Sequence, residues 1–285
     1  MSITADQFTD PLAYHGEGPV WHPCWPGLRF VDMLAGDIVC LDADGQQIQR
    51  MHLGSVAAAF RPRRGGGTVA AVERGFVLID PDGAVQNLPE LWDDVGIRMN
   101  EGGCDPHGRF YCGSMAYDLA VPSGSLYRLD PDGTVHVMVS NVTCSNGLGW
   151  SPSGETVYYI DSLTYRIDNF DYDPARGLLN RRPFVAVPRD QGLPDGLAVD
   201  REGGIWVAFF GGGAVRRYRP DGTIDEVIHL PVTQVTACTF GGPDLRDLFI
   251  TTSRQGIDGD SQPAAGSIYT AQPGTTGLPT TPYAG

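Results

Sequence analysis

Helix signals are almost absent from this 285-residue sequence, because no long segment carries apolar residues at i, i+3, i+4 and i+7 between caps. No stretch approaches the roughly 18 apolar residues that a transmembrane helix needs. Residues 1–18 show no basic patch followed by an apolar core, so we expect no signal peptide and a cytoplasmic location. These absences point to a chain built from strands and turns.

Several chemical signatures are also missing. The six cysteines show no C-x-x-C spacing, the six histidines show no metal-ligand pairing, and neither H-E-x-x-H nor G-x-S-x-G occurs. The net charge of -14 repels phosphate backbones and anionic lipid, which makes nucleic acid and membranes poor partners. Cations and neutral polyols remain open as ligands, and nothing in the sequence identifies a protein partner.

Short β-like runs and tight turns recur along the whole chain. Each turn starts with Asp, Ser or Arg and closes on a glycine where a positive φ is needed. The turns are Asp42–Gly45, Asp80–Gly83, Asp105–Gly108, Asp130–Gly133, Ser151–Gly154, Asp200–Gly203 and Arg219–Gly222. Two turns fall in each stretch of about 45 residues, the length of one four-stranded propeller blade. We therefore predict an all-β, six-bladed β-propeller as a single domain over 1–285, with one large or two small sandwiches as the alternative.

Four polar residues recur at blade-like intervals. Glu17, Asn100, Asn146 and Asp195 are separated by 83, 46 and 49 residues, which correspond to two blades, one blade and one blade. The innermost strand of each blade lines the central channel, so residues at equivalent positions face one another across the axis. Taken singly, an Asn-Gly or Asp-Gly pair is more often a hairpin turn. The joint spacing instead favours convergence on the axis, with the other two blades represented near Val56–Ala57 and Thr236.

The chemistry of this set is that of an oxygen-only cation site. Two carboxylates and two amide oxygens suit hard cations such as calcium, magnesium or manganese. Zinc is compatible with oxygen ligands, but these ligands do not single it out. A glycine follows Asn146 and Asp195 directly, which lets the backbone bend towards a crowded axis.

The segments that carry these residues resemble the family of senescence marker protein (regucalcin), gluconolactonase and luciferin-regenerating enzyme. The resemblance covers most of the chain, and YYIDSLTYRIDNFDYD is most similar to the regucalcin-type branch. The matching segments are GEGPVWHP, LRFVDM, RMNEGGCDPHGRFYCGSM, SNGLGWSPSGETVYYIDS, LPDGLAVDREGGIWVAFFGGG and FGGPDLRDLFITTSR. The resemblance implies a six-bladed propeller with one axial divalent metal, calcium in the first place.

The resemblance also implies roles for individual residues. Glu17, Asn146 and Asp195 match the metal ligands of the family. Arg98 matches an arginine that contacts substrate hydroxyls, Asn100 either ligates the metal or binds substrate, and Asp118 matches an acidic residue on a loop over the pocket.

The chain departs from the family pattern at three places. Glu101 stands where Asp is usual, the segment 116–124 is shorter than in the animal proteins, and Asp118 replaces a longer Glu.

The implied reaction is hydrolysis of a small sugar lactone. A divalent metal polarises the ester carbonyl and lowers the pKa of a water molecule, and Asp195 is the candidate general base. Two alternatives remain. One is a propeller hydrolase acting on another ester, including organophosphates or a non-sugar lactone, and the other is a calcium-binding protein without turnover. Arg98, Asn100 and Asp118 favour the sugar lactone, because a hydroxyl-rich substrate needs polar partners, whereas a pocket lined by aromatic residues would favour the other ester.

Overall fold

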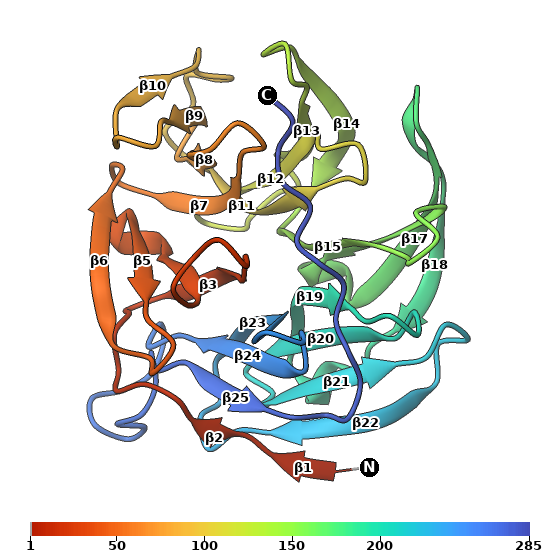
Figure 1. Ribbon diagram of the computed structural model, residues 1–285. Helices are drawn as coiled ribbons and strands as arrows, with labels where there is room; N and C mark the ends of the chain where they lie inside the picture. Colours follow the sequence, from red (N-terminus) through yellow and green to blue (C-terminus); the bar gives the residue numbers. More distant parts are fainter. Residues whose placement is uncertain (1) are drawn as a thin grey trace.

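The computed structural model describes residues 2–285 and contains six β-sheets, each built on four antiparallel strands and arranged as a blade in a ring (Figure 1). The predicted all-β, six-bladed propeller is therefore confirmed, and a sandwich is excluded. The helices of this part of the chain are three short 3-10 turns: η1 (Met33–Ala35), η2 (Ser162–Thr164) and η3 (Arg189–Gln191). None of them is long or apolar enough to cross a membrane.

Each blade has four strands, which we call the inner (first), second, third and outer (fourth) strand in order of their distance from the axis. The inner strands are β3 (Gly16–Val20), β7 (Ala57–Pro62), β11 (Ile97–Cys104), β15 (Ser145–Trp150), β19 (Leu193–Val199) and β23 (Val235–Gly241). The second strands are β4 (Arg29–Asp32), β8 (Thr68–Val72), β12 (Phe110–Ala116), β16 (Thr156–Asp161), β20 (Ile205–Phe210) and β24 (Asp247–Thr252). The third strands are β5 (Asp37–Leu41), β9 (Gly75–Ile79), β13 (Gly124–Leu129), β17 (Arg166–Asp173), β21 (Ala214–Tyr218) and β25 (Tyr269–Ala271). The outer strands are β6 (Gln47–His52), β10 (Val85–Asn87), β14 (Val135–Val142), β18 (Gly177–Ala186), β22 (Ile224–His229) and β2 (Asp6–Gln7).

The two ends of the chain meet in the last blade, which closes the ring. β2, near the N-terminus, pairs antiparallel with β25 and becomes the outer strand of the sixth blade. β1 (Ser2–Thr4) adds to the fifth blade by pairing parallel with β22. Because the first and last segments share a sheet, the ring cannot open without breaking these hydrogen bonds.

The seven predicted turns all form as expected. In each one the amide of the closing glycine donates to the carbonyl three residues earlier, at 2.8–3.2 Å. Each of these glycines has a φ between 75 and 90°. Non-glycine residues adopt this left-handed region only with strain, which explains why glycine ends every turn. These turns join first to second strands or third to fourth strands, so they gather at one end of the ring.

A C-terminal strap, residues 276–285, crosses that same end of the ring (Figure 1). It contacts several blades in turn: Gly277 donates its amide to Leu245 O at 2.8 Å, and Thr280 donates its hydroxyl to Trp21 O at 2.8 Å. Tyr283 then forms a parallel bridge with Arg63 on the second blade. The strap therefore ties together blades that are far apart in sequence.

Tyr283 anchors the strap, and its removal should destabilise the ring. The side chain is fully buried in the core of the second and third blades, and its hydroxyl donates to Asp130 O at 2.8 Å. Tyr283→Ala is expected to lower the free energy of unfolding by about 3–5 kcal/mol, because it leaves a cavity and removes a buried hydrogen bond. Urea unfolding measures the change. Tyr14→Ala is the matched control, since Tyr14 is 51% exposed, and an equal effect of both variants would contradict the assigned anchor.

Candidate active site

The beginnings of the inner strands meet at the end of the ring opposite the strap. There, Glu17, Arg98, Asn100, Asn146 and Asp195 line one cavity of about 430 Å³. All five side chains are buried. The sequence placed them on four different blades, and the closed ring brings them to one cavity floor.

An irregularity in every inner strand directs these side chains. The pairing of each inner strand with its second strand shifts register near the axis, for example between Met99 and Gly102, between Ser145 and Leu148, and between Pro194 and Leu197. Such β-bulges re-aim side chains and commonly occur beside functional sites. Asn100, Asn146 and Asp195 lie within these three bulges.

The glycines after Asn146 and Asp195 are required by crowding at the axis. A Cβ on Gly147 would lie 2.7 Å from Asp195 O, and one on Gly196 would lie 2.5 Å from the Ala237 Cβ. Neither distance is tolerated between these atoms without movement of the backbone. The predicted reason for these glycines is thus the observed one.

A chain of hydrogen bonds orients the amides of the floor. Arg98 Nη1 donates to Asn100 Oδ1 at 2.6 Å, and Asn100 Nδ2 donates to Asn146 Oδ1 at 2.8 Å. Asn146 Nδ2 in turn donates to Ser162 Oγ at 2.8 Å, and Ser162 donates to Pro194 O at 2.7 Å. An amide oxygen has two lone pairs, so Asn146 Oδ1 retains one for a further ligand.

The buried carboxylates of the channel disfavour one another's ionisation. Burial raises the pKa of Glu17 to about 7, against the lowering effects of the Gly18 amide and Arg98. Burial, followed by the charges of Glu17 and Glu101, raises the pKa of Asp195 well above its usual range. A cation between such carboxylates would reverse this effect by favouring their charged forms.

The donor set contains only two carboxylates that face the candidate cavity. Among residues 2–285, no three His, Cys, Asp or Glu side chains are grouped so that they could hold a metal ion by themselves. A site here therefore requires an amide oxygen beside Glu17 and Asp195, which Asn146 can supply, with water as the remaining ligand.

Asp118 is the one predicted site residue that the fold does not bring to the cavity. Its side chain is exposed, and its Oδ1 accepts the amide of Ala120 at 3.0 Å, within its own loop. Its neighbours Tyr117 and Leu119 line the cavity instead. The short carboxylate caps the local turn because an Asp oxygen reaches the backbone two residues ahead.

Sequence reasoning missed His15, Ser162 and the apolar wall of the cavity. His15 is buried, lines the cavity, and its Nδ1 lies 2.8 Å from Ser253 Oγ. Burial, followed by the charge of Arg98, lowers the pKa of His15 to about 3, so its ring is neutral at physiological pH. Its position two residues before Glu17 was a usable signal, because residues two apart share one face of a strand. No comparable signal marked Ser162.

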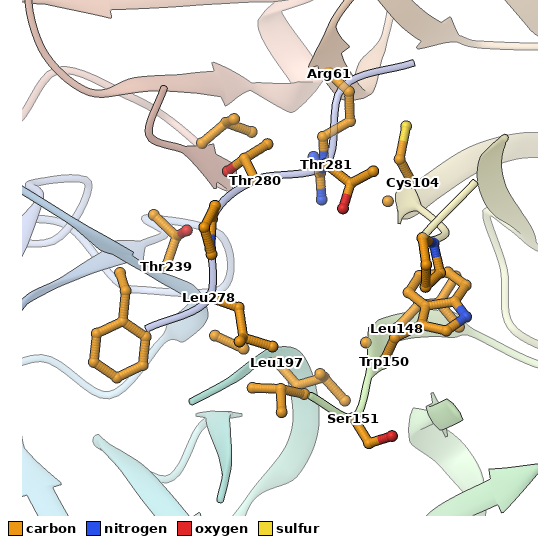
Figure 2. A pocket seen from close by; sticks show the side chains of 18 of the residues that line it. Arg61, Cys104, Leu148, Trp150, Ser151, Leu197, Thr239, Leu278, Thr280 and Thr281 are labelled. Atoms are coloured by element: carbon orange, nitrogen blue, oxygen red, sulfur yellow. The ribbon is translucent and has the colours of Figure 1, made fainter. Parts of the chain in front are cut away.

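A second cavity of about 360 Å³ lies at the other end of the axis, beneath the C-terminal strap. Figure 2 shows Leu278, Thr280 and Thr281 of the strap on one side of it and Arg61 reaching towards it. Glu101 lines this second cavity rather than the candidate active site. The departure from the family pattern at residue 101 therefore leaves the lining of the active site unchanged, although the charge of Glu101 acts on Asp195.

Comparison with known proteins decides the family. A model of the SMP-30/gluconolactonase/LRE-like region matches residues 15–254, which contain all six inner strands. This chain belongs to that family. Within it, regucalcin of Sus scrofa is 38% identical over 283 residues, covering 95% of each chain. The family resemblance inferred from sequence is thereby confirmed.

Solved structures of the SMP-30/gluconolactonase/LRE-like family share the whole fold. Regucalcin from Agrobacterium tumefaciens, described as a calcium-binding protein, aligns with a TM-score of 0.92 at 27% identity, covering 99% of this chain and 98% of that one. A luciferin-regenerating enzyme aligns with a TM-score of 0.90 at 27% identity, covering 99% of both chains. These relatives carry names for different activities, so the reaction has to be argued from the site.

Proposed function

We propose that this chain is a divalent-metal-dependent lactonase that opens a sugar lactone. The observation that carries the proposal is the convergence of Glu17, Asn146 and Asp195 on one buried cavity floor. Two carboxylates that repel each other in a buried channel are unfavourable unless a cation or protons neutralise them.

The floor fits a hard cation. Its candidate ligands are all oxygens, which suits calcium, magnesium or manganese better than a soft metal. Calcium is our first choice, supported by the description of the Agrobacterium tumefaciens relative as calcium-binding, and zinc is the remaining alternative. Bound there, the cation would polarise an ester carbonyl and lower the pKa of a nearby water.

Proton transfer and substrate orientation are assigned to side chains of the cavity floor. Asp195 would help to hold the cation, and its carboxylate is the proton acceptor for the attacking water. The water oxygen bonds to the carbonyl carbon, the ring C–O bond breaks, and the proton passes to the ring oxygen to give a hydroxy acid. Arg98 and Asn100 orient the lactone through its hydroxyl and carbonyl oxygens. The Nε–H of Arg98 is buried without a partner among residues 2–285, as expected of a site that binds a polar group.

A second candidate, hydrolysis of a non-sugar ester or organophosphate, is favoured by one observation. Leucine, methionine and phenylalanine side chains line the cavity above its polar floor. An apolar wall binds an alkyl or aryl group better than it binds a polyol. The same metal and the same base would serve both reactions.

Turnover should disappear with chelator and return with metal. We expect the metal-loaded chain to release protons from gluconolactone, and EDTA to lower that rate at least about a hundredfold, because both carbonyl polarisation and water activation are lost. Proton release is measured with a pH indicator for gluconolactone, phenyl acetate and paraoxon. Reconstitution with calcium, magnesium, manganese and zinc identifies the active ion. If metal-loaded protein turns over none of the substrates but binds calcium, the non-catalytic alternative replaces this proposal.

A further inference from the structure

We propose that the cavity selects a lactone that carries an apolar group at the end remote from its ester, in preference to a sugar lactone with hydroxyls throughout. This inference rests on the lactonase function proposed above and refines its substrate class: sugar lactones are turned over, but lactones with an apolar group are turned over with a higher kcat/KM. It follows from how polar and apolar side chains are divided between the floor and the wall.

The wall is apolar on most sides. Half of its apolar members come from the connections between second and third strands, and the other half lie on first or second strands. They are Leu34, Met115, Leu119, Leu163, Leu193 and Phe210. Leu34 belongs to η1 and Leu163 to η2, Met115 lies on β12, and Phe210 ends β20. Four blades therefore contribute apolar side chains to the wall.

Two of the polar side chains of the wall are hydrogen-bonded to other residues of the protein. The Tyr117 hydroxyl donates to Glu73 Oε1 at 2.7 Å, and the Ser162 hydroxyl donates to Pro194 O. Gln234 and Gln255 are the polar residues on the side of the sixth blade. Gln234 Oε1 is buried without a partner among residues 2–285, so hydroxyls near the ring would be recognised on that side and on the floor.

Leu119 gives the strongest indication of an apolar ligand. Its φ is 55°, in the left-handed region that disfavours leucine, and 36% of its surface is exposed. Backbone strain of this kind is found where a side chain is held for binding. The strained turn directs Leu119 to the cavity and leaves the carboxylate of Asp118 in solvent. The loop therefore presents a leucine where the family resemblance implied an acidic clamp for a sugar hydroxyl.

A series of substrates tests this preference. The probes are gluconolactone, pantolactone, which has one hydroxyl beside the carbonyl and two methyl groups, and γ-lactones with alkyl chains of one to six carbons. We expect kcat/KM to rise about fourfold for each added methylene until the wall is filled. Pantolactone should exceed gluconolactone. A kcat/KM that is flat or falls with chain length, with gluconolactone as the best substrate, would overturn the inference and leave the lactonase function standing.

Leu119→Asn tests the wall without endangering the fold, because asparagine tolerates the left-handed backbone better than leucine. We expect kcat/KM for the longest alkyl lactone to fall about tenfold or more, and kcat/KM for gluconolactone to change less than about twofold. Val121→Asn is the matched control. It makes a similar change on the same loop at a side chain that is 60% exposed and does not line the cavity, and it should alter neither value. Equal effects of both variants on the alkyl lactone would contradict a contact from Leu119.

Binding of alkyl δ-lactams, which resist hydrolysis, separates this inference from the proposed function. Calorimetry with the metal-loaded protein should show affinity that increases with alkyl length. If lactams bind in this way but no lactone is hydrolysed, the lactonase function fails and the apolar wall is upheld. If affinity is independent of alkyl length, the apolar wall is rejected whatever the turnover.

Discussion

Asp195→Asn is expected to lower kcat/KM of the metal-loaded protein about a thousandfold for any lactone that the wild type hydrolyses. The substitution keeps the shape of the side chain but removes both a charged metal ligand and the proton acceptor, and general-base catalysis alone contributes about 10²–10⁴. Metal affinity should fall in parallel, because an amide oxygen carries no net charge. Steady-state kinetics and calcium titration measure the two effects.

Asp105→Asn is the matched control for Asp195→Asn. Asp105 is fully buried but lies near the strap, where it bonds to the Arg109 side chain and accepts from Tyr172 Oη at 2.7 Å. Its loss should destabilise the fold, by about 3–5 kcal/mol for a broken buried ion pair, while the folded fraction keeps its activity. Asp195→Asn should leave the metal-free protein folded. If the two variants lose activity in proportion to stability alone, Asp195 has no specific role.

Glu17→Gln should remove the share of the pH dependence of stability that Glu17 contributes, while the raised pKa of Asp195 leaves a share of its own. The pKa of Glu17 is raised from a usual value near 4.5 to about 7. In the metal-free wild type, this group is protonated in both states below pH 4.5, and above that only the unfolded state ionises. Stability therefore falls as the pH rises from about 4.5 to about 7, by about 3 kcal/mol from Glu17. Beyond pH 7 the contribution is constant.

Calcium should remove this loss, so the stabilisation by metal should grow over the same pH window. Glu17→Gln cannot ionise, and we expect its metal-free form to be more stable than the wild type at pH 8 and to gain little from calcium. Unfolding by urea at pH 5, 6, 7 and 8, with EDTA or calcium, measures both effects. Glu73→Gln, a half-buried carboxylate outside the cavity lining, serves as the control. If the stability of the metal-free wild type does not change between pH 4.5 and 7, the raised pKa assigned to the buried Glu17 is contradicted.

The short strands and glycine-ended turns of this fold could be predicted from local sequence. The seven turns needed a glycine at a positive φ, and that requirement is visible in a single turn without any knowledge of the neighbouring blades. The spacing of Glu17, Asn100, Asn146 and Asp195 predicted that they face one another across the axis, because residues one blade length apart occupy equivalent positions in neighbouring blades. These positions could be predicted since they repeat.

Features that depend on non-repeating contacts could not be predicted. The capture of β2 by the sixth blade joins residues about 260 positions apart, and the passage of the strap over the far end follows no local pattern. Asp118 and Leu119 are adjacent on one short loop, and the conformation of that loop, with Leu119 at a φ of 55°, sends only Leu119 to the cavity. The apolar wall combines connections and strand ends from four blades, and none of these segments indicates a shared wall when it is considered alone.

The sequence by itself determined the alternation of strands and turns, the number of blades and which oxygen-bearing side chains face the axis. Each of these features follows from a short pattern that repeats at about one blade length. Only the tertiary structure decided how the ring closes, how the bulges aim neighbouring side chains at opposite ends of the channel, and what surrounds the polar floor. Those features depend on the packing of segments distant in sequence, where burial and steric crowding replace local propensity as the deciding terms.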